Sequence, residues 1–369
     1  MKDTDEYFLN MGPQHPSTHG VMRLELKMDG EVLDDVTPHI GYLHRSMEKI
    51  MENRTYMQII PLTDRLDYLA SMSNNLAYVM AVEKLAGISV PERSQYIRLI
   101  LVELNRIASH LIGVGTFAQD LGAFGTPMLY CFREREKIID IYEAVCGNRL
   151  LYSYFRFGGV SQDVPDNFLD MVREFIPYMT KKLGDLEKLL TNNIIFLKRT
   201  KGVGVIPQDM AVNCGVSGPN LRGSGIQWDL RRAEPYLNYD KFDFDIPVGE
   251  NGDAWDRYKV RIEEIRQSLR IVEQAIEKIP SGEINSLKPA QMRMIKPPKG
   301  EVYFRIESPR GDLGFFIVSD GSDKPYRVKV RTPSFSHLAV LKKILKGMKV
   351  ADIVAIFGSL DIVMGEVDR

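Results

Sequence analysis

Hydrophobic positions near the amino end of the chain follow the two-residue period of a half-buried strand. Every second residue from Met22 to Met28 is apolar and the residues between them are polar, so one face of this segment is apolar. Asp29-Gly30 supplies a hairpin turn, and residues 32–36 have the composition of a returning strand. The pattern predicts a small antiparallel sheet as the first module.

From about residue 42 the pattern changes to that of amphipathic helices. Apolar side chains recur every three or four residues in five long segments: 63–87, 91–113, 126–147, 165–190 and 253–279. Thr63 is the expected N-cap of the first segment, and Gly87 is its expected stop. Five such segments predict a helical bundle as the main body.

The other segments are glycine-rich or strand-like. Residues 215–225, "GVSGPNLRGSG", are expected to form an irregular loop because Gly and Pro favour turns, and residues 288–300 are expected to form a linker. Beyond it, "EVYFRIE", "LGFFIVSDG" and "YRVKVR" predict strands, followed by two short helices and the tail "GSLDIVMGEVDR".

These elements predict an α+β fold that is mainly α. The expected division is an amino-terminal β-hairpin module with a His-bearing loop (1–60), a helical bundle (61–285), and a carboxyl-terminal β-rich module with a tail (286–369).

Composition narrows the class of protein. The 48 Lys and Arg residues balance 49 Asp and Glu residues, so no overall field attracts nucleic acid. No apolar stretch approaches the ~20 residues that cross a bilayer, and "MKDTDEYFL" lacks the apolar core of a secretory signal. Three separated cysteines are too few for a disulfide framework, or for an iron–sulfur or zinc site held by this chain alone. We expect a soluble or peripheral protein of a reducing compartment.

The loop "GPQHPSTHG", residues 12–20, is the first candidate for chemistry. It places His15 and His19 four residues apart, and Pro13 and Pro16 oppose a helix there. A metal-binding pair of this spacing needs a helix to align both rings. The sequence therefore predicts no metal site at this loop.

The other histidines favour structural roles. His39 and His44 are expected to orient backbone or partner surfaces, and His110, in a helical stripe, is expected to be a buried core imidazole.

Three further polar positions have both a structural and a functional interpretation. In "TDRLDYLASMSNN", Tyr68 and its polar neighbours interrupt an apolar helical pattern, and composition alone favours a solvent-facing or partner-facing helix face. Asp120 follows an apolar helix, where a turn-forming carboxylate is common. Arg45 taken alone is expected to be a surface arginine in an ion pair.

Longer motifs resemble a known family. They include "MGPQHPSTHGVMRL", "PHIGYLHRSMEK", "DRLDY", "FRFGGV", "LRGSGIQWDLR", "IPVGENGDAWDRY", "YRVKVRTPSFSHL" and "GSLDIVMGEVDR". From about Leu9 to Arg369 the chain resembles the D-subunit family of bacterial NADH:quinone oxidoreductase, the respiratory complex I. The resemblance implies a fold similar to the large subunit of nickel–iron hydrogenases, a helical bundle with β-rich terminal modules.

The same resemblance argues against hydrogenase activity. Those relatives hold nickel through Arg-x-Cys-x-x-Cys and Asp-Pro-Cys-x-x-Cys elements. The matching stretches here, "RLDYLA" at 65–70 and "DIVMGE" at 361–366, contain no cysteine. Soft thiolate ligands have no substitute among these residues. The resemblance implies that the vacated cavity receives a quinone headgroup instead.

The resemblance also implies the site residues. His19 and Tyr68 match residues that bind the quinone headgroup, and each can bond one quinone oxygen and donate a proton. Asp120 matches a catalytic carboxylate that pairs with His19. Arg45 matches an arginine near the terminal iron–sulfur cluster of a partner subunit. The quinone, menaquinone or ubiquinone, is a substrate, and no metal or covalent cofactor is expected in this chain.

A proton-translocating assembly is implied as the setting. The expected partners are the small one-cluster iron–sulfur subunit, the C-type peripheral-arm subunit and the quinone-channel membrane subunit, on the cytoplasmic side of the cell membrane. The donor is NADH, ferredoxin or a deazaflavin, and the isolated chain is expected to be inactive. Leu150 and Leu151 stand where many relatives have a histidine, which favours menaquinone. The alternatives are a subunit of a membrane-bound hydrogenase-like complex and a non-catalytic scaffold.

Overall fold

The computed structural model describes residues 6–15, 20–123 and 125–369. Its helices are α1 (Met47–Glu52), α2 (Tyr56–Thr63), α3 (Ser71–Ala86), α4 (Glu92–Asp120), α5 (Thr126–Cys146), α6 (Phe168–Leu190), α7 (Ile194–Thr200), α8 (Gln208–Asn213), α9 (Gly218–Gly223), α10 (Leu230–Ala233), α11 (Ala254–Lys278), α12 (Pro289–Arg293), α13 (Pro333–Leu345), α14 (Val350–Leu360) and α15 (Met364–Asp368). Its strands are β1 (Glu6–Met11), β2 (Arg23–Asp29), β3 (Val32–His39), β4 (Phe155–Arg156), β5 (Gly159–Val160), β6 (Gly300–Ser308), β7 (Gly311–Ser319) and β8 (Arg327–Arg331).

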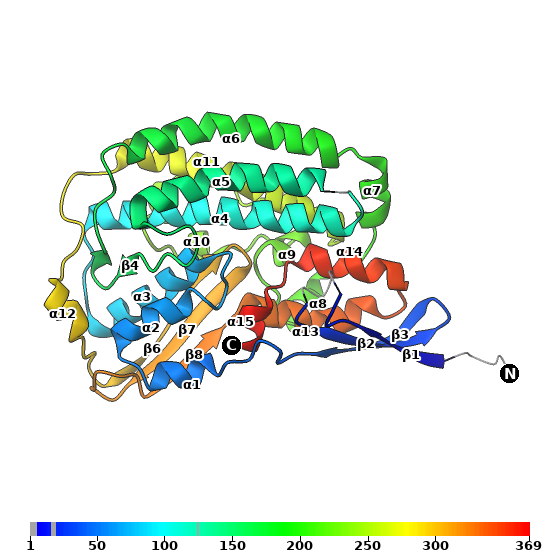
Figure 1. Cartoon of the computed structure of the whole chain (residues 1–369), viewed down its shortest axis with the longest axis horizontal. Helices are drawn as coiled ribbons and strands as arrows, with labels where there is room; N and C mark the ends of the chain where they lie inside the picture. Colours follow the sequence, from blue (N-terminus) through cyan, green and yellow to red (C-terminus); the bar gives the residue numbers. More distant parts are fainter. Residues whose placement is uncertain (1–5, 16–19, 124) are drawn as a thin grey trace.

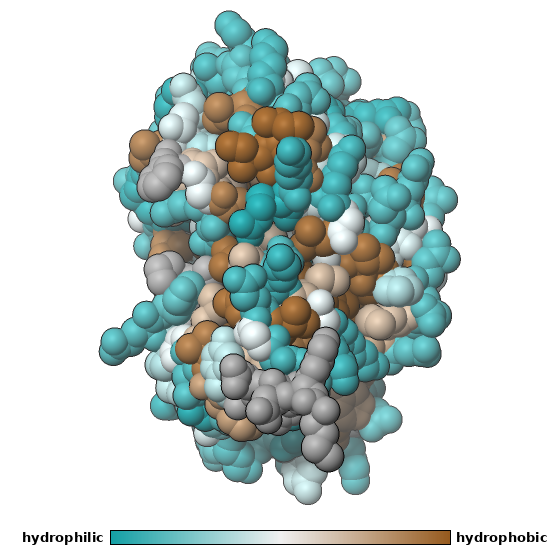
Figure 2. All heavy atoms as spheres, turned by 90° about the vertical axis from the view of Figure 1, so that its right-hand side faces the viewer, coloured by the Kyte–Doolittle hydropathy of each residue, from teal (hydrophilic) through white to brown (hydrophobic). Residues whose placement is uncertain are grey.

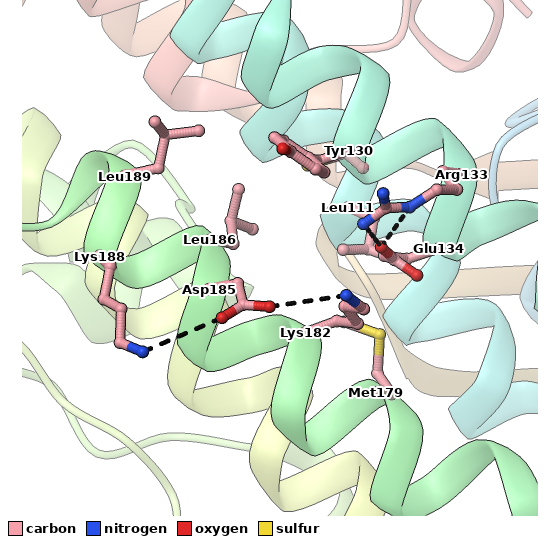
Figure 3. A pocket seen from close by; sticks show the side chains of 11 residues that line it. Leu111, Tyr130, Arg133, Glu134, Met179, Lys182, Asp185, Leu186, Lys188 and Leu189 are labelled. Carbon is pink, nitrogen blue, oxygen red and sulfur yellow. Dashed lines mark hydrogen bonds and ion pairs between the residues drawn. The ribbon is translucent and has the colours of Figure 1, made fainter.

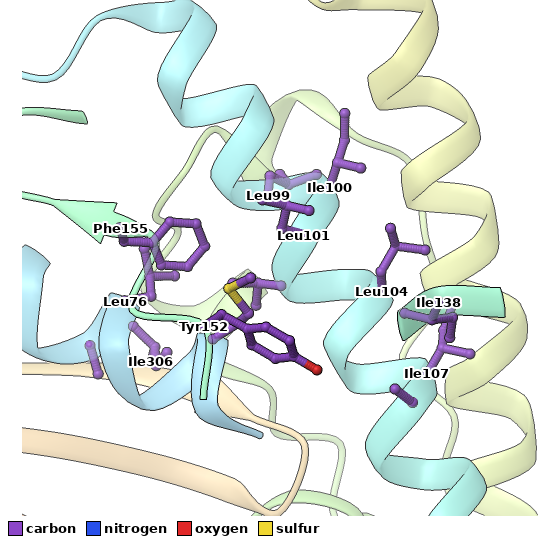
Figure 4. Packing of buried hydrophobic residues seen from close by; sticks show 14 of the residues in the cluster. Leu76, Leu99, Ile100, Leu101, Leu104, Ile107, Ile138, Tyr152, Phe155 and Ile306 are labelled. Atoms are coloured by element: carbon purple, nitrogen blue, oxygen red, sulfur yellow. The ribbon is translucent and has the colours of Figure 1, made fainter. Parts of the chain in front are cut away.

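Long helices and a carboxyl-terminal sheet form two layers. Helices α4, α5, α6 and α11 lie side by side (Figure 1). Helix α3 lies on the opposite side of α4 from α6, and the antiparallel sheet β6–β7–β8 packs against α3. Figure 4 shows apolar side chains of α4 packed toward α3, α5 and the sheet. The fold is therefore α+β and mainly α, and helices α5, α6 and α11 confirm the predicted segments 126–147, 165–190 and 253–279.

Helix α4 continues beyond its predicted end at residue 113 to Asp120. Two glycines in this part of the helix serve close packing. A Cβ atom at Gly113 would lie 3.0 Å from the Asp361 carboxylate, and one at Gly115 would lie 3.1 Å from Cβ of Cys131. Neighbouring segments therefore approach α4 at both glycines.

The predicted helix 63–87 is wrong in its first turns. Helix α2 ends at Thr63 and α3 begins at Ser71, so Thr63 is not an N-cap. In the turn between them, Asp67 Oδ1 accepts hydrogen bonds from the backbone N–H groups of Leu69 (3.1 Å) and Ala70 (3.2 Å). Such local side-chain bonds compete with a continuing helix. The expected stop is confirmed, since Gly87 ends α3 with φ 65°.

The segment 215–225 is not a wholly irregular loop, because it contains α9. Proline is tolerated in the first turn of a helix, where its missing N–H would have no helical partner, and Pro219 takes that place. A Cβ atom at Gly218 would lie 2.5 Å from the Arg310 carbonyl oxygen, and one at Gly223 would lie 3.0 Å from Cγ of Arg257. These glycines permit tight packing of α9. The predicted linker likewise contains the short helix α12.

The predicted amino-terminal hairpin is confirmed as β2 and β3, with β1 as a further strand on the other edge of β2. This sheet packs on helices from the carboxyl end of the chain (Figure 1). Leu33 N–H donates to the Met348 carbonyl oxygen at 2.9 Å, and Lys342 pairs with Asp35 at 3.0 Å. Apolar residues of β2 and β3 share one core with α13, α14 and α15.

Candidate functional site

The turn at residues 64–70 presents Tyr68 to the surface. The side chain is 41% exposed, and its hydroxyl forms no hydrogen bond with any residue in the described part of the chain. Partial burial of the ring and the neighbouring Asp67 carboxylate raise the pKa of Tyr68 above its usual value. The phenol is therefore protonated at neutral pH and has a donor to offer.

Arg310, in the hairpin between β6 and β7, fixes this turn. Its guanidinium lies 2.5 Å from Asp67 Oδ2 and donates to Ser109 Oγ at 3.1 Å and to Asp361 Oδ1 at 3.3 Å. Although burial opposes it, the carboxylates of Asp361 and Asp67 raise the pKa of Arg310. One buried cation thus joins the turn, α4 and the end of α14.

Helix α15 covers the same turn from the carboxyl end of the chain. A Cβ atom at Gly365 would lie 2.7 Å from the Leu66 carbonyl oxygen and 3.7 Å from Cε1 of Tyr68. The next residue, Glu366, is 1% exposed. Its Oε1 accepts a hydrogen bond from Ser334 N–H at 3.0 Å, and its Oε2 has no partner among the described residues. Burial, with the nearby Asp67 carboxylate, raises the pKa of Glu366 to about 7.

One stripe of α4 connects this turn with Asp120. Asn105 donates to the Leu69 carbonyl oxygen at 3.2 Å, and at the far end a Cβ atom at Gly358 of α14 would lie 3.5 Å from Asp120 Oδ2. The helical rise between Asn105 and Asp120 is about 22 Å. The turn that carries Tyr68 therefore lies against the middle of α4, whereas Asp120 lies at the carboxyl end of that helix. The structure does not bring the two side chains into contact.

Asp120 is the last residue of α4 and is half-buried. Burial raises the pKa of Asp120 to about 6, and the nearby charge of His15 opposes this rise. His15 is thus the histidine that the described residues bring toward Asp120, whereas His19 lies outside them. A cavity of about 540 Å³ adjoins this loop, lined by residues 9–15 and Val350.

Arg45 is exposed and donates a long hydrogen bond of 3.5 Å to the Arg65 carbonyl oxygen. Among the described residues it has no carboxylate partner, so the surface ion pair that its sequence context favours is absent there. Its loop is held by Asp368, whose carboxylate accepts from Gly41 N–H at 2.9 Å and Leu43 N–H at 2.7 Å.

The histidine predictions can be compared with these contacts. His44 Nδ1 lies 2.6 Å from the Asp368 carbonyl oxygen and must donate, which confirms its predicted role in orienting backbone. His110 is buried and bonded through Nε2 to Glu264 at 2.8 Å, as a core imidazole was expected to be. His39 pairs with Glu25 at 3.3 Å.

Sequence reasoning missed Arg310, Glu366 as a buried acid, and Asp368. Each is a single charged residue in an ordinary sequence context, and only folding brings it to the turn or the loop. Of the three, only Glu366 lies in a stretch that the resemblance singles out, residues 361–366. That stretch was interpreted only as lacking the nickel-binding cysteines.

Other surfaces lie away from this turn. A cavity of about 420 Å³ between α5 and α6 has apolar walls and a charged rim (Figure 3). Figure 2 shows hydrophobic residues on the face that includes α7 and the start of α5, where Leu129, Ile194 and Ile195 are each more than 60% exposed.

Among the described residues, no group of three or more His, Cys, Asp or Glu side chains is arranged to hold a metal ion. None of the helices described has both the length and the apolar character needed to cross a membrane.

Comparison with known proteins identifies the family. Residues 120–369 match the family model described as "Respiratory-chain NADH dehydrogenase, 49 Kd subunit". The chain belongs to this family of complex I subunits. It is 58% identical over 366 residues to the D subunit of NADH-quinone oxidoreductase from Dehalococcoides mccartyi, with 99% of both chains covered. The D subunits from Bacillus anthracis (53%, 99% of both chains) and Geotalea uraniireducens (51%, 100% of both chains) are similar over the same extent.

As a complex I subunit, the chain is part of an NADH-quinone oxidoreductase and partners with the other subunits of that enzyme. The family model covers Asp120, Arg310 and Glu366, whereas Tyr68 and Arg45 fall in the part matched by the full-length relatives.

Proposed function

We propose that this subunit forms the quinone-reduction site of complex I. The single observation that carries the proposal is the hydroxyl of Tyr68. Its residue is 41% exposed, and the hydroxyl has no hydrogen-bond partner among the described residues, on a turn that Arg310 fixes from within. A partner-free donor on a rigid support is suited to a carbonyl oxygen that arrives with a substrate. The relatives' name, NADH-quinone oxidoreductase, supplies a substrate with such oxygens.

Reduction of a quinone takes two electrons and two protons and forms the quinol. The phenol of Tyr68 donates a hydrogen bond to one quinone oxygen and then its proton, as a positioned general acid. His19 takes the same role at the other oxygen, and Asp120 pairs with that histidine and holds its ring. The electrons come from the iron–sulfur cluster of a partner subunit.

Charge and exposure support the proposed position in the assembly. Arg45 is exposed and has no described acidic partner, so its fixed positive charge is available to the partner subunit's cluster. The exposed apolar residues at α7 and the start of α5 suit contact with another subunit. We propose a peripheral position on the cytoplasmic face of the membrane, against the one-cluster, C-type and quinone-channel subunits, in a proton-translocating enzyme that uses menaquinone or ubiquinone.

The test is Tyr68→Phe in the assembled complex. Loss of the phenol proton removes a general acid, and we expect quinone reduction to fall about 100-fold or more. Electron transfer from the donor to hexacyanoferrate, which bypasses the quinone, is expected to remain normal, as is subunit composition. Tyr130→Phe, a comparably exposed tyrosine on α5, is the matched control. A complete Tyr68→Phe complex with an unchanged quinone rate would favour the scaffold alternative.

A further inference from the structure

Glu366 is a buried acid that the proposed chemistry does not yet use. Its side chain is 1% exposed, one oxygen accepts the Ser334 N–H, and the other oxygen is buried without a donor among the described residues. An ionised carboxylate in that position would have one charged oxygen without a donor among the described residues, which is costly inside a protein.

The charges around Glu366 act on its pKa in opposite directions, since Asp67 raises it and Arg310 lowers it. Arg310 is the nearby cation, and its guanidinium already contacts the carboxylates of Asp67 and Asp361. Glu366 has no ion pair within the described part of the chain, and the negative charge of Asp67 acts on it directly. Burial and Asp361 also raise the pKa of Asp67, but the Asp67 carboxylate accepts from Arg310 and from two backbone N–H groups. Of the two acids, Glu366 is therefore the one that is more stable with a proton.

The other titratable groups around α15 do not change this conclusion. On α13, His337 donates through Nε2 to the Ser217 carbonyl oxygen at 3.1 Å, and burial lowers its pKa to about 3, so it is neutral. Arg369 donates to the Val330 carbonyl oxygen at 2.7 Å and lies over the ring of Phe335. Asp368 is bonded to the loop at residues 40–46, together with His44.

Glu366 lies next to the contact between α15 and Tyr68. Its neighbour Gly365 approaches the edge of the phenol ring closely enough that a Cβ atom would lie 3.7 Å from Cε1. Tyr68 and Glu366 also share the charges of Asp67 and Arg310 as neighbours.

We propose that Glu366 stores a proton beside the turn and returns it to Tyr68 after the phenol has protonated the reduced quinone, an inference that rests on the proposed quinone site. In this step the O–H bond of the Glu366 carboxyl breaks and the O–H bond of Tyr68 forms again, with a bridging water as the relay because no hydrogen bond joins the two groups directly. The Glu366 carboxylate then takes up a proton from water before the next turnover. No electron moves, because the quinone has already received both electrons from the enzyme's donor. Glu366 touches no substrate and serves the reaction through Tyr68.

The pH dependence has a definite sign. The pKa of Glu366 is raised, so its proton is present below about pH 7 and is lost as the pH rises through that value. We expect the steady-state rate of quinone reduction by the wild-type complex to decline above about pH 7, because Tyr68 then recovers its proton slowly.

The experiment compares Glu366→Gln with wild type in the assembled complex. Glutamine has a similar volume and keeps an oxygen for the Ser334 N–H, but it has no proton to transfer. We expect the first turnover to stay close to wild type, because Tyr68 supplies its own proton, and later turnovers to slow about tenfold. The decline near pH 7 is expected to disappear in Glu366→Gln and to persist in Glu366→Asp.

Glu134→Gln is the matched control, since Glu134 is a buried glutamate of α5 that pairs with Arg133 away from this cluster. Infrared difference spectra of the wild-type complex test the protonation state even if the variant fails to assemble. They are expected to show the carbonyl band of a buried, protonated carboxyl group at pH 6 that fades through about pH 7.

Two results would overturn the inference: no such band in the wild type, or wild-type later turnovers and pH profile in Glu366→Gln. The proposed function fails separately, through Tyr68→Phe. If Tyr68→Phe loses quinone reduction while Glu366→Gln remains normal, the quinone site stands and only the proton store is wrong.

Discussion

Gly365 shows how little space separates α15 from the turn that carries Tyr68. A Cβ atom there would lie 2.7 Å from the Leu66 carbonyl oxygen, closer than side chains approach backbone in folded proteins. The phenol is therefore positioned by backbone packing on one side and by Arg310 on the other. A single added methyl group is enough to move it.

We predict that Gly365→Ala shifts the turn and weakens quinone binding. In the assembled complex, the apparent KM for quinone is expected to rise about tenfold, which corresponds to about 1.4 kcal/mol. Gly184→Ala on α6, where a Cβ atom meets nothing within 4 Å, is expected to leave that KM unchanged. An unaltered KM for Gly365→Ala would show that this contact does not position the phenol.

Sequence patterns and resemblance named Tyr68, because a tyrosine and charged residues interrupt an apolar segment inside a family motif. They could not reveal Arg310 or Glu366 as its neighbours. These residues lie more than 240 positions away from Tyr68 along the chain, and their burial is decided by how the β6–β7 hairpin and α15 pack. Local patterns carry no information on such contacts.

At the scale of elements, periodicity predicted where helices form better than where they end. Helix α11 lies within one residue of its predicted bounds because Asp253 caps it through a local side-chain contact. The start of α3 and the end of α4 were missed because Asp67 closes a turn in an apolar pattern and Gly113 serves packing instead of termination. Helix ends that depend on contacts with distant residues cannot be predicted from the local sequence.

We predict that Asp253→Ala loosens the start of α11. Asp253 Oδ1 accepts from Asp256 N–H at 2.9 Å and Oδ2 accepts from Gly202 N–H at 2.8 Å. Loss of such a cap costs about 1 kcal/mol. Hydrogen–deuterium exchange of the complex is expected to speed up about fivefold in the first turn of α11. Glu277→Ala is the control, an exposed change near the carboxyl end of the same helix. It is expected to leave exchange in the first turn of α11 as in the wild type.

At the scale of the whole molecule, the two ends of the chain are packed together. The amino-terminal sheet shares a core with α13, α14 and α15, and Asp368 holds the loop at residues 40–46. The sequence predicted the strands and the helices separately. It could not predict that segments about 300 residues apart form one unit, because nothing local pairs them.

We predict that Asp368→Ala releases the loop that carries Arg45. Removing the carboxylate leaves the N–H groups of Gly41 and Leu43 without their acceptor. Their deuterium exchange in the complex is expected to accelerate at least about tenfold, since each lost hydrogen bond contributes about 1 kcal/mol. Glu301→Ala, an exposed change on β6, is the control. Unchanged exchange at residues 41 and 43 would mean that other contacts hold the loop.

The packing of β1–β3 on α13–α15 also sets an order for folding during synthesis. A ribosome makes the strands first and releases the helices that cover them only after some 300 further residues. Until then the apolar side of the new hairpin, including Leu24 and Leu26, is exposed to solvent. Such nascent apolar surfaces bind chaperones or aggregate. Slow translation of the last segment would prolong this vulnerable interval.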